Sequence, residues 1–252
     1  MSSSIALITG GSRGLGRSTA LKLAERGADV ILTYRSNHEA AEDVVATIQS
    51  KGRKAVALQL DVGDSSSFAD FAASVRDGLA DVWQREKFDA LINNAGMGTH
   101  ASFADTTEAQ FDTLMRVHLK GPFFLTQALL SLLSDGGRIL NVSSGLTRFS
   151  VPGASAYATM KGGVEVLTRY LAKELGPRGI AVNTIAPGAI ETDFSGGLVR
   201  DNSEMNEFVA SATALGRAGQ PDDIGGFIAS LLSPESRWVN AQRIEASGGM
   251  FL

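Results

Sequence analysis

Short apolar runs alternate with longer amphipathic segments along nearly the whole chain of 252 residues. Runs such as 28–34 and 180–186 have the length and composition of buried strands, and the segments between them repeat apolar residues at helical spacing. Strands that alternate with helices form a mainly parallel sheet that is covered by helices on both faces. The sequence therefore predicts one α/β domain over residues 1–252, built on a doubly wound parallel sheet.

The pattern also predicts the bounds of individual elements. We expect strands at residues 4–9, 28–34, 54–60, 88–92, 138–143, 180–186 and 242–246. The two longest predicted helices span residues 107–133 and 154–176. Residues 189–218 have no clear period, and we expect an irregular, variable segment there.

Composition excludes several classes of protein. Hydrophobic residues make up 44% of the chain, which is enough for a sizeable core. A net charge of −4 with interspersed acids and bases indicates neither a nucleic-acid nor an anionic-membrane partner. The chain has no cysteine, and its three histidines lack metal-ligand spacing. No apolar run is long enough to span a bilayer and the start has no basic leader, so we expect a cytoplasmic protein.

The first predicted strand ends in a glycine-rich turn that leads directly into a helix. Such a turn lets backbone N–H groups approach a phosphate, and the positive end of the helix faces the same point. The glycine spacing differs from G-x-G-x-x-G, and an ordinary tight turn is the alternative. We favour a pyrophosphate site, formed by Gly10, Ser12, Arg13, Gly14, Leu15 and Gly16.

The end of the second strand bears on the choice between NAD and NADP. In an NAD site an acidic residue there binds the ribose hydroxyls. This chain has the uncharged Tyr34, followed by Arg35 and Ser36, while Arg13 lies in the glycine turn. Two arginines and a serine suit a 2′-phosphate, although both arginines could be solvated surface charges. We therefore favour NADP(H).

Other candidate residues also follow strands. Asp61, at the third strand, could accept a hydrogen bond from an adenine amino group or could cap the next helix. Small residues after the fourth and sixth strands would let a cofactor approach the backbone. These strand ends supply Asp61, Val62, Asn93, Ala95, Gly96, Pro187 and Gly188.

Tyr157 and Lys161 are four residues apart, so they share one face of the predicted helix, and Ser144 ends the fifth strand. An ammonium about 4 Å away supplies roughly the 4 kcal/mol that would lower a tyrosine pKa from about 10 to about 7. Such a tyrosine can exchange a proton with an alcohol or a carbonyl oxygen, and Ser144 could hydrogen-bond the same oxygen. Alone, the pair could equally be a packed ring and a surface charge.

Taken together, these motifs resemble the short-chain dehydrogenase/reductase family, in its order and spacing over nearly the whole chain. The motifs are Thr9-Gly10-x-x-x-Gly14-x-Gly16, Asn93-Asn94-Ala95-Gly96, Ser144, Tyr157-x-x-x-Lys161 and Pro187-Gly188-x-x-x-Thr192. The resemblance implies a single Rossmann-type domain that interconverts a carbonyl and a secondary alcohol with NADP(H). Within the family, members similar to 3-oxoacyl-carrier-protein reductases are the nearest general resemblance.

The resemblance also implies roles for particular residues. Tyr157 would be the general acid/base, Lys161 would lower its pKa and hold the nicotinamide ribose, and Ser144 would orient the substrate carbonyl. Ile190 and Thr192 would contact the nicotinamide carboxamide, while Asp61, Val62 and Asn93 would contact the adenosine half. The stretch 193–215 would be a substrate lid, and the helices 107–133 and 154–176 would pack between subunits of a homotetramer.

One departure from the family concerns the catalytic set. The family commonly has an asparagine where this chain has His118, and the main-chain carbonyl at that position binds a water of a proton relay. A backbone carbonyl survives the substitution, and an imidazole could join the relay or simply fill the space. We favour a working relay and a neutral imidazole. The alternative to an enzyme is a member that binds the cofactor as a sensor or scaffold with little turnover.

Overall fold

The computed structural model describes residues 3–252. Met1 and Ser2, which belong to the start that we expect to lack a basic leader, lie outside the described residues. Within residues 3–252, seven parallel strands form one sheet in the order β3-β2-β1-β4-β5-β6-β7. The strands are β1 (Ile5–Ile8), β2 (Asp29–Tyr34), β3 (Ala55–Gln59), β4 (Phe88–Asn93), β5 (Leu133–Val142), β6 (Ala181–Pro187) and β7 (Arg243–Ala246). The predicted doubly wound parallel sheet is confirmed.

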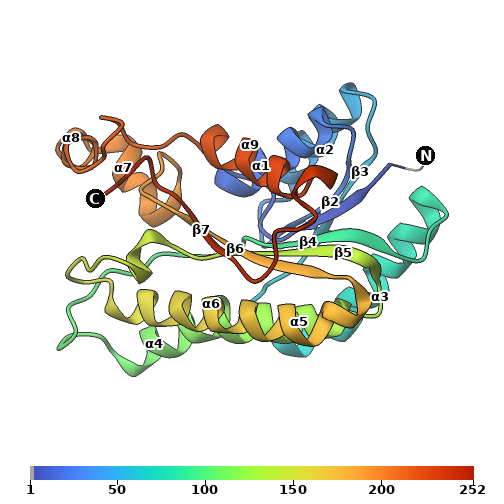
Figure 1. Cartoon of the computed structure of the whole chain (residues 1–252), viewed down its shortest axis with the longest axis horizontal. Helices are drawn as coiled ribbons and strands as arrows, with labels where there is room; N and C mark the ends of the chain where they lie inside the picture. The colour runs from blue at the N-terminus through green and yellow to red at the C-terminus, as the bar shows by residue number, and fades with distance from the viewer. Residues whose placement is uncertain (1–2) are drawn as a thin grey trace.

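Helices cover both faces of this sheet (Figure 1). One face carries α1 (Gly14–Glu25), α2 (His38–Ser50) and α9 (Pro221–Leu231), and the other carries α3 (Phe68–Gly78), α4 (Glu108–Met115), α5 (Gly121–Leu129) and α6 (Ser155–Leu175). Each face has its own buried apolar cluster. Strands β1 and β6 are buried along their whole length, as expected for parallel strands between two helical layers.

Local signals explain where several helices begin and end. The side chain of Asn37 accepts a hydrogen bond from the Ala40 N–H and starts α2. Pro221 occupies the first turn of α9, where a missing N–H costs nothing. A further short turn, Gly176–Arg178, follows α6 and ends it. None of the helices within residues 3–252 is both long enough and apolar enough to cross a membrane.

Two predicted segments were wrong. The single helix predicted at 107–133 is divided into α4 and α5, which are joined by a π-helical turn, Arg116–Lys120. Helix α5 ends at Leu129 because Leu133 already pairs with Phe88 in the sheet. The stretch predicted to be irregular contains a short turn, Phe194–Gly197, and two helices, α7 (Leu198–Asp201) and α8 (Ser203–Ser211). Both helices lie beyond the carboxyl ends of the central strands (Figure 1).

Candidate active site

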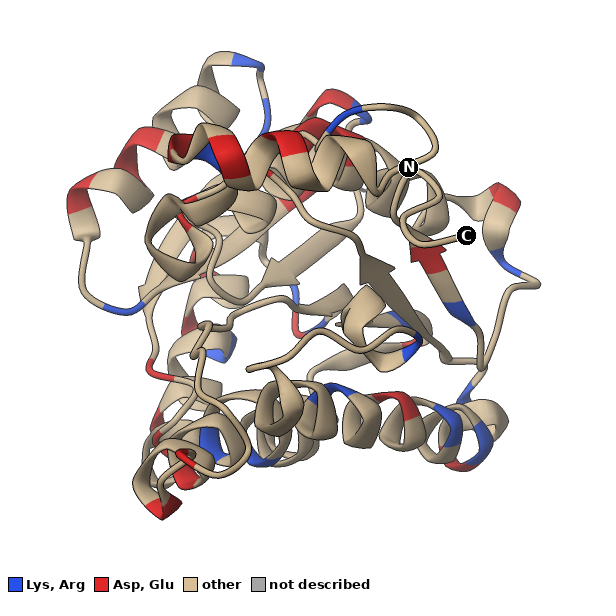
Figure 2. Cartoon of the chain, turned by 90° about the vertical axis from the view of Figure 1, so that its left-hand side faces the viewer, with Lys and Arg blue, Asp and Glu red and all other residues tan. Residues whose placement is uncertain are grey.

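The candidate site lies along the carboxyl edge of the sheet. Since all strands are parallel, the residues that follow β1 to β6 emerge at one edge, and the order reverses between β1 and β4. Ligands of open α/β sheets bind at such a point. Figure 2 looks onto this edge, where most of the central ribbon carries neither acidic nor basic residues and the charges lie mainly on the surrounding helices.

The glycine turn after β1 is closely packed against the turn after β4. The side-chain amide of Asn94 donates to the carbonyl oxygens of Thr9 (2.8 Å) and Gly10 (3.2 Å). A Cβ atom at Gly16 would overlap the Gly10 carbonyl oxygen, so this position needs glycine. The first turn of α1 has no side-chain cap, which leaves its backbone N–H groups for an anion. The sequence motif included Asn94 but gave its side chain no role.

The residues predicted to hold a 2′-phosphate surround this turn. Arg13 precedes α1, and Arg35 and Ser36 follow β2; all three are exposed, while Tyr34 is partly buried. Within residues 3–252 neither arginine side chain forms an ion pair or a hydrogen bond. His38 lies edge-on to Tyr34, with ring centroids 5.3 Å apart. The corner is therefore positively charged and open, which fits a phosphate group.

The side chains of Asp61 and Asn93, which follow β3 and end β4, have partners that the sequence did not predict. Asp61 does not cap the next helix: its side chain accepts from the Gly63 N–H at 2.8 Å, and Asp64 provides the cap by accepting from Ser66 N–H. Asn93 is buried, and its amide donates to Asn141 (2.8 Å) inside the sheet. The side-chain amide of Asn93 thus stabilises the neighbouring strand and is not directed to an open site.

Ser144, Tyr157 and Lys161 are brought together as the sequence predicted. The Nζ atom of Lys161, which is 5% exposed, donates to the Val142 carbonyl at 2.7 Å and lies 5.6 Å from the centre of the Tyr157 ring. Ser144 ends the strand segment and its Oγ accepts from the Leu146 N–H at 3.2 Å. The three side chains therefore meet at the carboxyl end of β5.

The pKa of Tyr157 contradicts the predicted direction. Burial raises the pKa of the Tyr157 phenol, and a hydrogen bond with Ser144 offsets only part of this. Burial also lowers the pKa of Lys161 to about 8, so Lys161 is still mostly protonated at neutral pH. The predicted lowering of the tyrosine pKa was wrong for this structure because desolvation of the phenolate outweighs the hydrogen bond with Ser144.

His118 lies inside the π-helical turn and is fully buried. Its Nε2 atom lies 2.7 Å from the Met97 carbonyl oxygen and 3.3 Å from the Met97 amide nitrogen. Because a carbonyl oxygen can only accept, the shorter contact favours the tautomer with its proton on Nε2. Burial, with a smaller contribution from the Lys161 charge, lowers the pKa of His118 to about 3, so the ring is neutral as predicted. Its Nδ1 atom has no partner within residues 3–252. A Cβ atom at Gly96 would lie 2.8 Å from the imidazole Cε1, so glycine at 96 makes room for the ring.

The segment after β6 covers the site. Pro187 pairs with Ala246 in the sheet, Gly188 follows, and the Ile190 side chain packs against the core. Thr192 is 9% exposed, and a Cβ atom at Gly14 would lie 3.6 Å from Thr192 Cβ. The segment therefore reaches back to the glycine turn. Of the other predicted residues, Leu15 packs against the same core, and the Val62 carbonyl oxygen lies against Gly121.

Phe194 was missed in the sequence. Its ring centroid lies 6.0 Å from that of Tyr157, and its side chain is 43% exposed. A Cβ atom at Gly98 would lie 3.0 Å from Phe194, so Gly98 and the turn that carries Phe194 are in contact across the site. An aromatic residue in an unpatterned polar stretch gives no signal of this position.

A family model described as enoyl-(acyl carrier protein) reductase matches residues 10–251. An oxidoreductase of Methylorubrum extorquens is 38% identical over 98% of this chain and 97% of its own. Versicolorin reductase 1 of Aspergillus parasiticus is 34% identical over 98% of this chain and 96% of its own. The chain belongs to the short-chain dehydrogenase/reductase family. It is thus an oxidoreductase of that family.

Solved structures of this family superpose on nearly the whole chain. The promiscuous reductase LugOII, which catalyses keto-reduction at C1 during lugdunomycin biosynthesis, has a TM-score of 0.94 at 39% identity, covering 99% of this chain and 98% of its own. The angucycline C-6 ketoreductase LanV with bound NADP has a TM-score of 0.93 at 35% identity, covering 98% of this chain and 95% of its own. The short-chain dehydrogenase/reductase fold therefore extends over nearly the whole described chain, including residues 189–218.

Proposed function

We propose that this short-chain dehydrogenase/reductase is an NADPH-dependent ketoreductase with Tyr157 as its general acid. The observation that carries the proposal is the convergence of Ser144, Tyr157 and Lys161 beside the glycine turn. Ser144 hydrogen-bonds the substrate carbonyl oxygen and Tyr157 gives it a proton. Lys161, held by the Val142 carbonyl, supports the developing phenolate.

The residues around the site fit a dinucleotide phosphate. The uncapped N-terminus of α1 would bind the pyrophosphate, and Arg13, Arg35 and Ser36 would bind the 2′-phosphate. Lys161 and Tyr157 would hold the nicotinamide ribose, and Ile190 and Thr192 the carboxamide. Asp61, Val62 and the main chain of Asn93 would line the adenosine half, and a cofactor ribose would approach the backbone at Ala95 and Gly96. When bound, this cofactor supplies the hydride.

Carbonyl reduction starts from a protonated Tyr157, whereas alcohol oxidation starts from its phenolate. Burial raises the pKa of Tyr157, so the phenol carries its proton at neutral pH, the state from which reduction starts. Alcohol oxidation would instead require a phenolate in a site that desolvation makes unfavourable. Because the pKa of Lys161 is lowered only to about 8, its ammonium is present when the proton leaves Tyr157. A protonated acid beside a cation suits carbonyl reduction.

Two ketone classes are candidate substrates. The similarity to carrier-protein reductases favours a 3-oxoacyl group or a small ketone. LugOII is named for keto-reduction at C1 during lugdunomycin biosynthesis, LanV as an angucycline C-6 ketoreductase, and the Aspergillus parasiticus relative as a versicolorin reductase. The exposed Phe194 ring beside Tyr157 supports a flat aromatic ketone, because its free face offers such a ring a stacking partner next to the proton donor. We propose that residues 189–218 are the substrate lid of a single domain.

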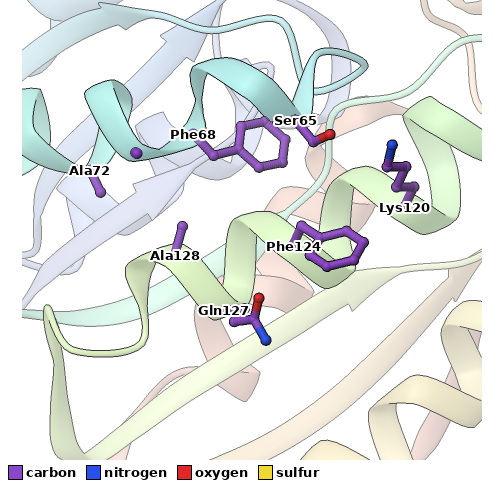
Figure 3. Close-up of a pocket in the computed structure, with 8 residues that line it drawn as sticks. Ser65, Phe68, Ala72, Lys120, Phe124, Gln127 and Ala128 are labelled. Atoms are coloured by element: carbon purple, nitrogen blue, oxygen red, sulfur yellow. The ribbon is translucent and has the colours of Figure 1, made fainter.

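We also propose that the enzyme is a cytoplasmic homotetramer. Large apolar side chains are exposed on the outer layer of helices, among them Phe123 (46%), Phe124 (41%) and Tyr170 (65%). Figure 3 shows Phe68 and Phe124 on opposite sides of a groove between α3 and α5. Its volume is about 410 Å³. A second copy that packs its own α5 and α6 here would remove this apolar surface from water.

NADPH oxidation by the wild-type protein, measured with a panel of 3-oxoacyl thioesters, small ketones and polycyclic aromatic ketones, tests the proposal. We expect turnover with at least one class, and a loss of aromatic substrates in Phe194→Ala if stacking selects them. Tight NADPH binding without turnover of any ketone would instead support a cofactor-binding sensor.

A further inference from the structure

A network of charged side chains surrounds the turn that carries Ser144. Glu165 on α6 accepts from Ser143 Oγ and Thr147 Oγ1, each at 2.7 Å, and from Arg243 Nε at 2.9 Å. Its side chain is 13% exposed. Arg243 also donates to the Ser144 carbonyl oxygen at 3.4 Å. The turn formed by residues 144–149, here the Ser144 turn, is therefore held on both sides of Ser144 by one carboxylate and one guanidinium.

A second pair extends this network to the end of the chain. Arg148 binds the Glu245 carboxylate through Nε (2.8 Å) and a terminal nitrogen (2.7 Å). The same guanidinium donates to the carbonyl oxygens of Met250 (2.6 Å) and Phe251 (3.1 Å). The Arg148 guanidinium lowers the pKa of Glu245 to about 2, and Ser247 and Arg243 add to this against a cost of burial. Arg148 thus joins the Ser144 turn to residues 247–251, here the C-terminal segment.

The C-terminal segment is in turn bonded to the lid. The Phe251 N–H donates to the Ala212 carbonyl at 2.9 Å, and the Leu215 N–H donates to the Gly248 carbonyl at 3.1 Å. The Phe251 ring lies between Phe149 of the Ser144 turn (4.9 Å between centroids) and Phe208 of α8 (6.4 Å). One short segment therefore contacts both the Ser144 turn and the lid.

We propose that Arg148 is a positioning residue: with Glu245, it fixes the Ser144 hydroxyl against the substrate carbonyl and couples this position to the lid through the C-terminal segment. The inference rests on the proposed function, in which Ser144 binds the substrate oxygen. The physical reason is geometric. A bidentate guanidinium with two further carbonyl partners restricts the turn on several sides at once, whereas the Ser144 hydroxyl is bonded to its own turn through the Leu146 N–H.

A double-mutant cycle tests the positioning role. We expect Arg148→Met to lower kcat about 10- to 100-fold, because an error of about 1 Å in the position of a reacting group costs up to about 100-fold. The NADPH Kd should stay within about twofold. In a Ser144→Ala background the same substitution should cost less than about threefold, since Arg148 acts through Ser144. Losses that multiply in the double variant, or an unchanged kcat in Arg148→Met, would overturn the proposal.

Arg178→Met is a matched control. Arg178 binds Asp135 at 2.8 Å and donates to the carbonyl oxygens of Leu130 and Leu133, so it has the same kinds of partner at the opposite end of β5. We expect it to lower stability without lowering kcat. Glu245→Gln, which keeps the side-chain size, provides a second disruption of the same pair should Arg148→Met fold poorly.

Hydrogen exchange separates failure of this inference from failure of the proposed function. We expect Arg148→Met to speed amide exchange at residues 203–215 and 247–251, and Arg178→Met to leave both unchanged. This readout needs no substrate. If the wild type reduces no ketone but exchange rises as expected, the coupling stands and the ketoreductase assignment fails. Unchanged exchange in both Arg148→Met and Glu245→Gln refutes the coupling whatever the activity.

Discussion

The imidazole of His118 lies edge-on against the phenol ring of Tyr157, with ring centroids 5.1 Å apart and planes at 84°. The imidazole edge is held there by the bond from Nε2 to the Met97 carbonyl. A neutral, buried imidazole on one side and Phe194 on the other keep water from most of the phenol. This packing accounts for the direction of the pKa shift of Tyr157, since a phenolate is poorly solvated in such surroundings.

Tyr157→Phe should lower kcat for ketone reduction by about 10²- to 10⁴-fold, because it removes the proton donor and keeps the ring packing. NADPH should still bind, as measured by fluorescence titration. Tyr170→Phe is the control, since Tyr170 is an exposed tyrosine on the same helix. Near-normal turnover in Tyr157→Phe would remove Tyr157 from the mechanism.

Arg35→Ala should erode the preference for NADPH over NADH by about tenfold or more, because a hydrogen bond to a charged group contributes roughly 1.5–3 kcal/mol. The efficiency with NADH should change little. Arg76→Ala, an exposed arginine on α3, controls for loss of a surface charge. Equal efficiency of the wild type with both cofactors would contradict the assignment of this corner to a 2′-phosphate.

His118→Asn should keep the activity and the shape of the pH–rate profile, because the neutral ring does not titrate between pH 5 and 9. An acid-side inflection near pH 6.5 in the wild type that disappears in the variant would instead place His118 in the proton relay. Steady-state profiles of both proteins distinguish the two outcomes.

The same substitution should change how stability depends on pH. The pKa of His118 is about 3 when folded and about 6.5 when unfolded, so the unfolded chain binds the proton first as the pH falls. This group therefore destabilises the wild type by about 2 kcal/mol between pH 7 and pH 5. Denaturant unfolding should show that loss in the wild type and in His100→Asn, and should not show it in His118→Asn.

The rate of reduction should fall above about pH 8, where Lys161 loses its proton, since burial lowers the pKa of Lys161 to that value. Below that pH the ammonium is present and the rate should be flat down to about pH 6. Stopped-flow measurement of the hydride-transfer step isolates this effect. A rate that stays level through pH 9.5 would show that the ammonium charge is not required.

Sedimentation at micromolar concentration should give a homotetramer, and Phe124→Asp should shift it to smaller species, because a carboxylate would be placed in the apolar contact. Tyr170→Phe should leave the tetramer intact. A wild-type monomer under these conditions would refute the assembly proposed from α5 and α6.

The parallel sheet could be predicted because strands such as β6 are continuous apolar runs, and the site because parallel strands bring their carboxyl ends to one edge. Contacts between residues far apart in the sequence could not be predicted. Glu165 follows Lys161 by one helical turn and was open to notice, but its partner Arg243 is 78 residues away. The direction of the Tyr157 shift depends on burial, and the rings packed against Tyr157 belong to His118 and Phe194, 39 and 37 residues away along the chain, so no local pattern encodes it.

The space that Gly96 leaves for His118 constrains how this protein can change. With the imidazole in place, a methyl group at 96 would meet Cε1 at 2.8 Å, so the ring would have to shift and its bond to Met97 would be disturbed. A smaller residue at 118 removes that obstacle. The two substitutions therefore have an order: a residue smaller than histidine at position 118 must come before a residue larger than glycine at position 96. A lineage that has histidine at 118 is confined to glycine at 96, whatever selection acts on the rest of the site.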